Sequence, residues 1–348
     1  MLKKISILIL AASVFTVSVM AENLVFKSYF DAYLTAFTDI GDAQEVYKEA
    51  ALLYEGAAAR NASAIELEIL LASKQRKAMD VRDKTSQAAI DAFGLFSQYQ
   101  ASAQSLAIST SRLNVAKESM KNDESQFALG LISETDYLTK KLNFQISVAN
   151  LELARRTLED TERKIARALG TKAVFAPFPM LGSPAIMASL SAVPLTAALT
   201  ASADVHTAKA NLSINEKTWK VISGSSFANE LEKKDALEKY KTAKKAYTKA
   251  IESLEDSCIA LERSIADLRS QYDRLMTSSR MADVSFDSAK LRKNSGKSTD
   301  LEFTLAQSDY QAKQNEIGQF AYKLIAKKLE ILMMAGGDCV GYLREVLP

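Results

Sequence analysis

Prolines are confined to few places in this chain, and their positions constrain its architecture. The 348 residues include only five prolines and twelve glycines. Four of the prolines share one eighteen-residue stretch, and the fifth is the last residue: Pro177, Pro179, Pro184, Pro194 and Pro348. Since proline and glycine disfavour helix interiors most, the segments on either side of this stretch can form long helices. The sequence therefore predicts two long helical halves joined by a linker at residues 171–193.

Apolar residues recur with the spacing of helices that pack along their length. In the second half they alternate by four and three residues at Leu254, Cys258, Leu261, Ile265, Leu268, Tyr272 and Leu275. Similar seams begin at Leu95 and at Phe144. This heptad spacing predicts coiled-coil packing against one partner helix. The nearest strand-like piece, residues 218–227, is short and weak, so we predict an all-α fold with little or no β structure.

The two halves repeat one another at an offset of 166 residues. The matched positions are Gly130 with Gly296, Ser133 with Thr299, Asp136 with Glu302, and Gly170 with Gly336. A repeat at this separation indicates a duplicated supersecondary unit. We expect a first helical-hairpin repeat over residues 22–170, a second over residues 194–337, and a C-terminal tail at residues 338–348.

Each repeated motif predicts a tight turn between two antiparallel helices. Gly130 and Gly296 suit the left-handed conformation that closes a helix. A hydroxyl residue follows each glycine after three positions and can cap the next helix, as Ser133 in one copy and Thr299 in the other. Thr299 with Glu302 gives a full capping box, whereas the acid of the first copy is the shorter Asp.

The N-terminus has the pattern of a secretory signal peptide. Lys3 and Lys4 precede an apolar run over residues 5–19, and small residues precede the expected cleavage point after Ala21. An uncleaved N-terminal anchor is the alternative, although the run is short for a membrane span. We therefore expect residues 1–21 to be removed and the protein to be exported.

Charge and motif content exclude several classes of function. Removing the two lysines of residues 1–21 from 44 basic residues leaves 42, against 42 acidic ones, so the basic excess of a nucleic-acid binder is absent. No later segment has the ~18 uncharged apolar residues of a membrane helix. The single histidine, His206, has no cluster of cysteines or carboxylates beside it and is expected to be structural. The sequence indicates no catalytic, cofactor or metal site.

These features resemble the TolC-like outer membrane efflux proteins. The family pattern is a long helix with Phe-x-x-Gly, a Ser or Thr three residues on, an acid at plus six, and a helix that ends in Leu-Gly. It is present as Phe127-Ala-Leu-Gly130-Leu-Ile-Ser133-Glu-Thr-Asp136 with Leu169-Gly170. The second copy keeps the glycine, hydroxyl and acid and adds Ala306-Gln307. The resemblance covers most of residues 24–340.

The resemblance implies a homotrimer whose hairpins form an α-barrel in the periplasm or at the periplasmic side of the outer membrane. Its tips would meet a periplasmic adaptor protein, itself bound to an inner-membrane pump. The family's tip contacts map onto Gly130, Leu131, Ile132, Ser133, Gly296, Lys297, Ser298 and Thr299. A constricting ring of carboxylates would map onto Glu302, although the second acid of that ring is replaced by Leu305. The capping box alone is the alternative role for Glu302.

The family's transmembrane strands have no clear counterpart. A strand pair with its loop needs roughly 30 residues of alternating polarity in each half. Residues 55–100 instead have helical periodicity and high charge, and in the second half only Trp219 to Phe227 could be a remnant. We therefore expect the chain to keep the helical hairpins and to lack most or all of the membrane strands.

The two cysteines allow a disulfide in an exported protein. Cys258 lies 38 residues before Gly296, and Cys339 lies 43 residues after it. At ~1.5 Å per helical residue, both stand roughly 60 Å from the same tip on adjacent arms. The alternative is a buried Cys258 and a free Cys339.

Two functions are compatible with these observations. The first is a TolC-like conduit of an efflux or secretion system that docks an adaptor by its tips. The second is a periplasmic coiled-coil scaffold or interaction protein derived from that family, with no channel activity. Retention of both tip motifs favours the first, and the missing strands favour the second.

Overall fold

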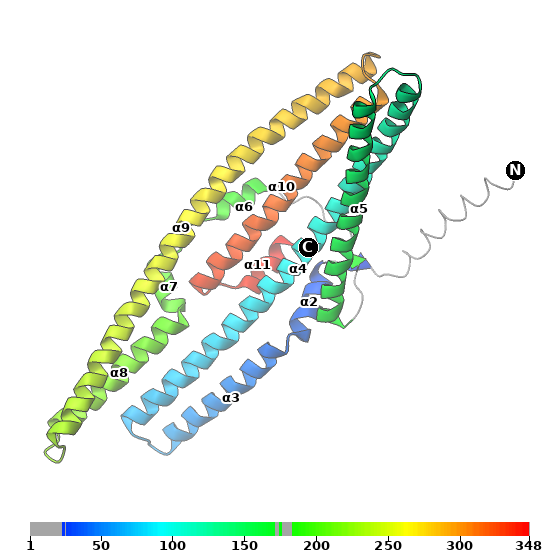
Figure 1. Cartoon of the computed structure of the whole chain (residues 1–348). Coiled ribbons are helices and arrows are strands. Elements are labelled where there is room, and N and C mark those ends of the chain that lie inside the picture. The colour runs from blue at the N-terminus through cyan, green and yellow to red at the C-terminus, as the bar shows by residue number, and fades with distance from the viewer. Residues whose placement is uncertain (1–22, 25, 171–173, 176–182, 348) are drawn as a thin grey trace.

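The computed structural model describes residues 23–24, 26–170, 174–175 and 183–347, and this part of the chain is almost wholly helical (Figure 1). The helices are α2 (Phe26–Ala36), α3 (Thr38–Ala59), α4 (Ala64–Ala128), α5 (Glu134–Leu169), α6 (Ser183–Ser189), α7 (Leu195–Ala201), α8 (Ala203–Gly224), α9 (Glu230–Asn294), α10 (Asp300–Ala335) and α11 (Cys339–Val346). Among the described residues, β structure is limited to β1 (Asn23–Leu24) and β2 (Val174–Phe175), which pair in parallel. The predicted all-α fold is confirmed. The predicted signal peptide and much of the predicted linker lie outside the described residues.

Helices of equal length recur in the two halves. Both α4 and α9 have 65 residues, and their ends are 166 positions apart in the chain. Both α5 and α10 have 36 residues at the same offset. The shorter α3 and α8 have 22 residues each. Each half therefore contributes a short and a very long helix joined by a turn, followed by a descending helix.

The four longest helices form one layer in the order α5, α4, α10, α9, because α4 packs against α5 and α10, and α10 packs against α9. The α4–α5 and α9–α10 turns lie at one end of the elongated molecule, and the α3–α4 and α8–α9 turns lie at the other (Figure 1). Within the chain, α5 and α9 therefore form the two edges of the layer.

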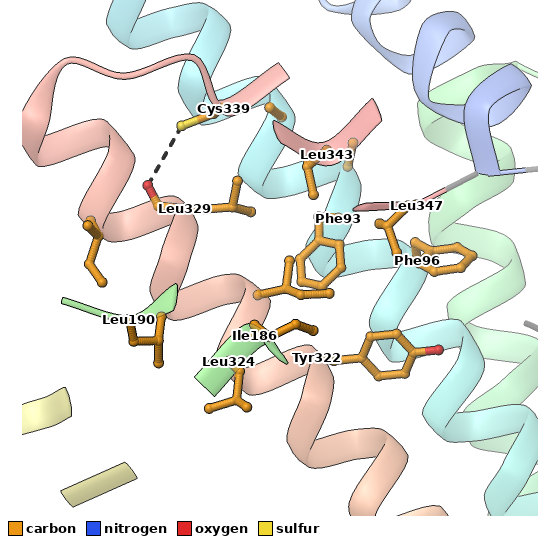
Figure 2. Packing of buried hydrophobic residues seen from close by; sticks show 14 of the residues in the cluster. Phe93, Phe96, Ile186, Leu190, Tyr322, Leu324, Leu329, Cys339, Leu343 and Leu347 are labelled. Carbon is orange, nitrogen blue, oxygen red and sulfur yellow. Dashed lines mark hydrogen bonds between the residues drawn. The ribbon is translucent and has the colours of Figure 1, made fainter. Parts of the chain in front are cut away.

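The hydrophobic core lies near the middle of the molecule, where several elements converge on α4 and α10. Phe93 and Phe96 of α4 pack against Tyr322 of α10, with ring centroids 6.1 and 6.2 Å apart, and Leu343 of α11 belongs to the same cluster (Figure 2). From α2, the buried Tyr29 hydroxyl donates a hydrogen bond to the Ala92 carbonyl at 3.0 Å. Burial of so many large side chains fixes the two hairpins relative to each other.

Two short helices complete this core, in regions where the sequence analysis expected a linker and a tail. Helix α6 buries Ile186 against α10, and Leu190 follows it into the core. Leu343 of helix α11 and Leu347, which follows the helix, are fully buried, and Arg344 forms an ion pair with Asp31 of α2 at 2.6 Å. The described linker and C-terminal residues are therefore part of the packed structure.

The weakly strand-like residues 218–227 form no strand, in agreement with the predicted all-α fold. Helix α8 continues through Gly224, and the Trp219 ring stacks on Tyr240 of α9 with centroids 5.5 Å apart. Short turns at residues 60–63 and 225–229 close helical hairpins in both halves, where the family resemblance would place strand pairs. The expected lack of those strands is confirmed for the described residues. None of the described helices combines the length and the hydrophobicity that crossing a bilayer requires.

Candidate functional site

The first hairpin tip, residues 129–133, has a closely defined backbone. Gly130 adopts the left-handed conformation at φ 68°. Its amide donates to the Phe127 carbonyl at 2.9 Å, and the Leu131 amide donates to the Gln126 carbonyl at 2.8 Å. This pair of bonds is a Schellman motif, which satisfies the last free carbonyls of α4. The end of α4 is therefore closed by backbone hydrogen bonds, and Leu129 and Leu131 are exposed beside the glycine.

The second tip, residues 295–299, repeats this backbone. Gly296 has φ 70°, and its amide donates to the Lys293 carbonyl at 3.0 Å. The Lys297 amide donates to the Arg292 carbonyl at 2.8 Å. Two turns with the same geometry stand at the same end of the molecule (Figure 1).

The helices that descend from the two tips are capped differently. The Thr299 hydroxyl accepts from the Glu302 amide at 3.2 Å, and the Glu302 carboxylate accepts from the Thr299 amide at 3.0 Å. This is the predicted full capping box. At the first tip, the Ser133 hydroxyl accepts from the Asp136 amide at 3.1 Å and donates to the Asp136 carboxylate at 2.6 Å. The shorter acid thus bonds to the serine side chain.

Glu302, the residue onto which the family's aperture acid maps, is held by its own turn. One carboxylate oxygen accepts from the Thr299 amide and also from the Ser298 hydroxyl at 2.9 Å. The backbone bond from Thr299, followed by the bond from Ser298, lowers the pKa of Glu302 below its usual value. The carboxylate is therefore ionised and engaged in capping in the single chain.

The rings beneath the tips differ in character. Phe127 stacks on Tyr137 at the first tip, with centroids 4.5 Å apart. At the second tip, the equivalent pair is Lys293 and Phe303, and the lysine nitrogen lies 4.3 Å from the ring centroid. The stacked aromatic pair of the first repeat is thus replaced by a cation–π contact in the second repeat.

Charge also separates the two tips. Residues 122–137 have four acidic residues and no basic one, and Leu129 and Leu131 of this segment are exposed. The equivalent residues of the second tip, 288–303, have four basic and two acidic residues. The first tip is therefore acidic and apolar, whereas the second is basic.

The edges of the helix layer carry exposed apolar residues. The α9 stripe consists of Met281, Val284 and Leu291, each 70% exposed, and the first two line a shallow groove. The α5 stripe consists of Leu138, Leu142, Ile146 and Leu153, all exposed. At 3.6 residues per turn, each stripe lies opposite the face that packs against the neighbouring helix of the same chain. The sequence analysis missed both stripes, although the α9 stripe with Ser288 has a heptad spacing.

Both cysteines are free thiols in this structure. The Cys258 sulfur lies 3.7 Å from the Met334 sulfur, and the buried Cys339 thiol donates to the Leu329 carbonyl at 3.6 Å (Figure 2). Burial raises the pKa of both thiols. Each cysteine therefore has a different neighbour, and the two are not bonded to each other.

His206 lies in the first turn of α8, where its amide donates to the Ser202 carbonyl at 3.0 Å. Within the described part of the chain, no group of three or more His, Cys, Asp and Glu side chains is placed to hold a metal ion.

Comparison with known proteins returned solved structures alone, since no family model and no curated protein matches the chain. CusC has a TM-score of 0.63 and 13% identity, covering 90% of this chain and 96% of that chain. The outer membrane protein VceC from Vibrio cholerae has a TM-score of 0.59 and 12% identity over 90% and 96%. The outer-membrane channel OprN has a TM-score of 0.61 and 15% identity over 90% of both chains. At these identities, the likeness establishes a shared fold.

Proposed function

We propose that this chain, which has the fold of the TolC-like outer membrane channels, is the oligomeric helical conduit of an efflux or secretion system. In this proposal its hairpin tips dock a periplasmic adaptor protein, and the adaptor binds an inner-membrane pump. The two repeats, residues 22–170 and 194–337, contribute one docking tip each. The observation that carries the proposal is the pair of apolar stripes on the two edges of the helix layer.

The stripes support a closed ring of copies. Each stripe faces away from its own chain, toward the place where the next helix of a continued layer would lie. Because the two edges are different surfaces, the contact between copies is heterologous, with α9 of one copy on α5 of the next. Heterologous contacts close into rings when the rotation between copies allows it. The shared fold favours three copies.

The two stripes lie at similar distances from their tip glycines, as such a contact requires. Leu142 stands 12 residues after Gly130, and Val284 stands 12 residues before Gly296. At ~1.5 Å per residue, each lies about 18 Å from its tip glycine. In the proposed ring, these two side chains meet between neighbouring copies.

The tips are proposed to bind the adaptor through different chemistry. Residues 130–133 offer the exposed Leu131 and the half-buried Ile132, flanked by acids, which suits an adaptor surface with apolar and basic residues. Residues 296–299 lie in a basic segment that suits an acidic surface. Glu302 of each copy would stand near the aperture of the ring while it keeps its capping bonds.

Charge reversal at the tips tests the docking role. Leu131→Glu and Lys297→Glu should each weaken crosslinking to the adaptor in cells and lower export, because they oppose the proposed complementarity. Asn143→Glu is a matched control, since this exposed residue is away from both tips and off the α5 stripe. Unchanged adaptor crosslinking and export in both tip variants would contradict docking at these residues.

A scaffold or interaction protein without channel activity is the second candidate, and the helical hairpins at residues 60–63 and 225–229 favour it. Deleting the gene separates the two. If the chain is a conduit, the deletion strain should lose export. Expression of the wild-type chain in that strain should restore export, and expression of the tip variants should not. Export that is unchanged by the deletion would favour the scaffold.

A further inference from the structure

The α8–α9 turn, residues 225–229, has an unusually apolar apex. Phe227 is 98% exposed, and Val221 and Leu231 on the flanking helices are also exposed. Residues 221–229 contain no charged side chain, in a chain of which 25% of residues are charged. Three large apolar side chains exposed on and beside one uncharged turn, rather than a single one, point to an interaction site.

The fold itself does not require Phe227. The start of α9 is fixed by a capping box between Asn229 and Glu232, and the Phe227 backbone amide is satisfied by the Ser225 hydroxyl at 3.2 Å. The corresponding α3–α4 turn closes without an aromatic residue, through a Ser63 cap and an ion pair between Arg60 and Glu66. The aromatic apex is therefore free to serve an interaction.

The surroundings of the apex have the composition of a membrane interface. The stacked Trp219 and Tyr240 rings lie behind it, since Trp219 stands five residues, or about 8 Å, before the end of α8. Lysines and acids alternate on either side of the turn, and Lys217, Lys220 and Lys233 form ion pairs with Glu68, Glu216 and Glu230, so Lys234 adds to a flank that is close to neutral. Trp and Tyr rings next to an uncharged apolar segment are typical of protein surfaces that rest on lipid headgroups.

We propose that the α8–α9 turn inserts Phe227 into the surface of a lipid bilayer, with Leu231 and Val221 at the headgroup level. This turn is at the opposite end of the molecule from the two hairpin tips, so lipid and adaptor can be bound together (Figure 1). Only the identity of the membrane, the periplasmic face of the outer membrane, rests on the proposed function. Several copies in a ring would strengthen the contact by multivalency.

The sole tryptophan makes the proposal directly measurable. Trp219 fluorescence of the full chain without residues 1–21 is recorded with vesicles of phosphatidylethanolamine and phosphatidylglycerol, with or without bromine on the acyl chains. We expect binding to the vesicles and quenching of Trp219 by the brominated lipid. Phe227→Ala should weaken partitioning about 10- to 100-fold per inserted ring, and Phe227→Glu should weaken it further.

Asn143→Glu, which adds the same charge at an exposed position far from this turn, is the matched control and should bind vesicles like the wild type. Absence of vesicle binding by the wild-type chain, or equal binding by the wild type and Phe227→Glu, would overturn the lipid contact. Sedimentation of the same samples measures their oligomeric state, and it therefore distinguishes a failure of the lipid contact from a failure of the proposed conduit. A chain that forms the ring but does not bind vesicles contradicts only the lipid contact, and a monomer that binds vesicles through Phe227 contradicts only the conduit.

Discussion

Leu142→Glu should disrupt the proposed ring while leaving the single chain folded. Leu142 lies on the α5 stripe and is 55% exposed in the single chain, so about half of its side chain remains to be buried. Full burial of a leucine contributes about 1.5–3 kcal/mol, so the remaining half contributes roughly 1 kcal/mol. A carboxylate placed against apolar groups adds a penalty of roughly 1–3 kcal/mol.

Together these effects amount to roughly 2–4 kcal/mol for each contact between copies. Since about 1.4 kcal/mol corresponds to a tenfold change in an equilibrium constant, each contact should weaken roughly 30- to 700-fold. Sedimentation velocity over a concentration series measures this directly. The wild type should sediment as a concentration-dependent oligomer, and Leu142→Glu should remain a monomer at the same concentrations.

Asn143→Glu adds the same charge to the neighbouring exposed position, which lies off the stripe, and should associate like the wild type. Circular dichroism of both variants should match that of the wild type, because neither residue is buried in the single chain. Equal association of Leu142→Glu and the wild type would refute the assignment of the α5 stripe to an interface.

Three further changes test the fold around the site. Gly336→Ala should lower the free energy of unfolding, measured by urea denaturation, more than Gly296→Ala does. An alanine at either site adopts a left-handed conformation that costs roughly 1–2 kcal/mol. Only at Gly336 would the new Cβ also lie 3.0 Å from the Ala201 Cβ. Glu302→Gln should increase amide exchange at the second tip at pH 7. Because the folded-state pKa of Glu302 is lowered from 4.5, its stabilising effect is present above that value and lost as the pH falls through the folded-state pKa, so the variant and wild type should exchange alike in acid. Leu343→Ala should lower the free energy of unfolding by about 2–5 kcal/mol, since the leucine is fully buried between α11 and the core.

The long helices and their turns could be predicted because their signals are local. The positions of the prolines delimit the two halves, and Gly130 and Gly296 with their following hydroxyl residues mark the turns. Capping and left-handed glycine depend on a few adjacent residues, so they can be recognised without knowledge of the tertiary structure.

The shorter elements could not be predicted, because tertiary contacts stabilise them. Helix α11 has eight residues and is held by the burial of Leu343 and Leu347 against distant helices. Residues 218–227 have only a short, weak strand-like pattern, and packing between α8 and α9, including the stacking of Trp219 on Tyr240, stabilises helix α8 through Gly224. Intrinsic preferences of short segments are routinely overridden by such contacts.

The edge stripes illustrate a different limit. Leu142 and Val284 are apolar residues of long helices, and the sequence does not distinguish a face that meets a helix of the same chain from one that meets another copy. Only the order of helices in the layer shows that these faces have no partner within the described part of the chain.

Crosslinking between the two edges tests the central claim most directly. Leu142→Cys and Val284→Cys are combined in one chain with Cys258→Ser and Cys339→Ala and treated with a short bismaleimide. The two new cysteines lie on opposite edges of one layer, so a heterologous ring predicts products between copies that end at the trimer. Neither single-cysteine variant should crosslink. Failure of the double variant to give products between copies, or dimers from either single variant, would contradict a ring built by α9 on α5.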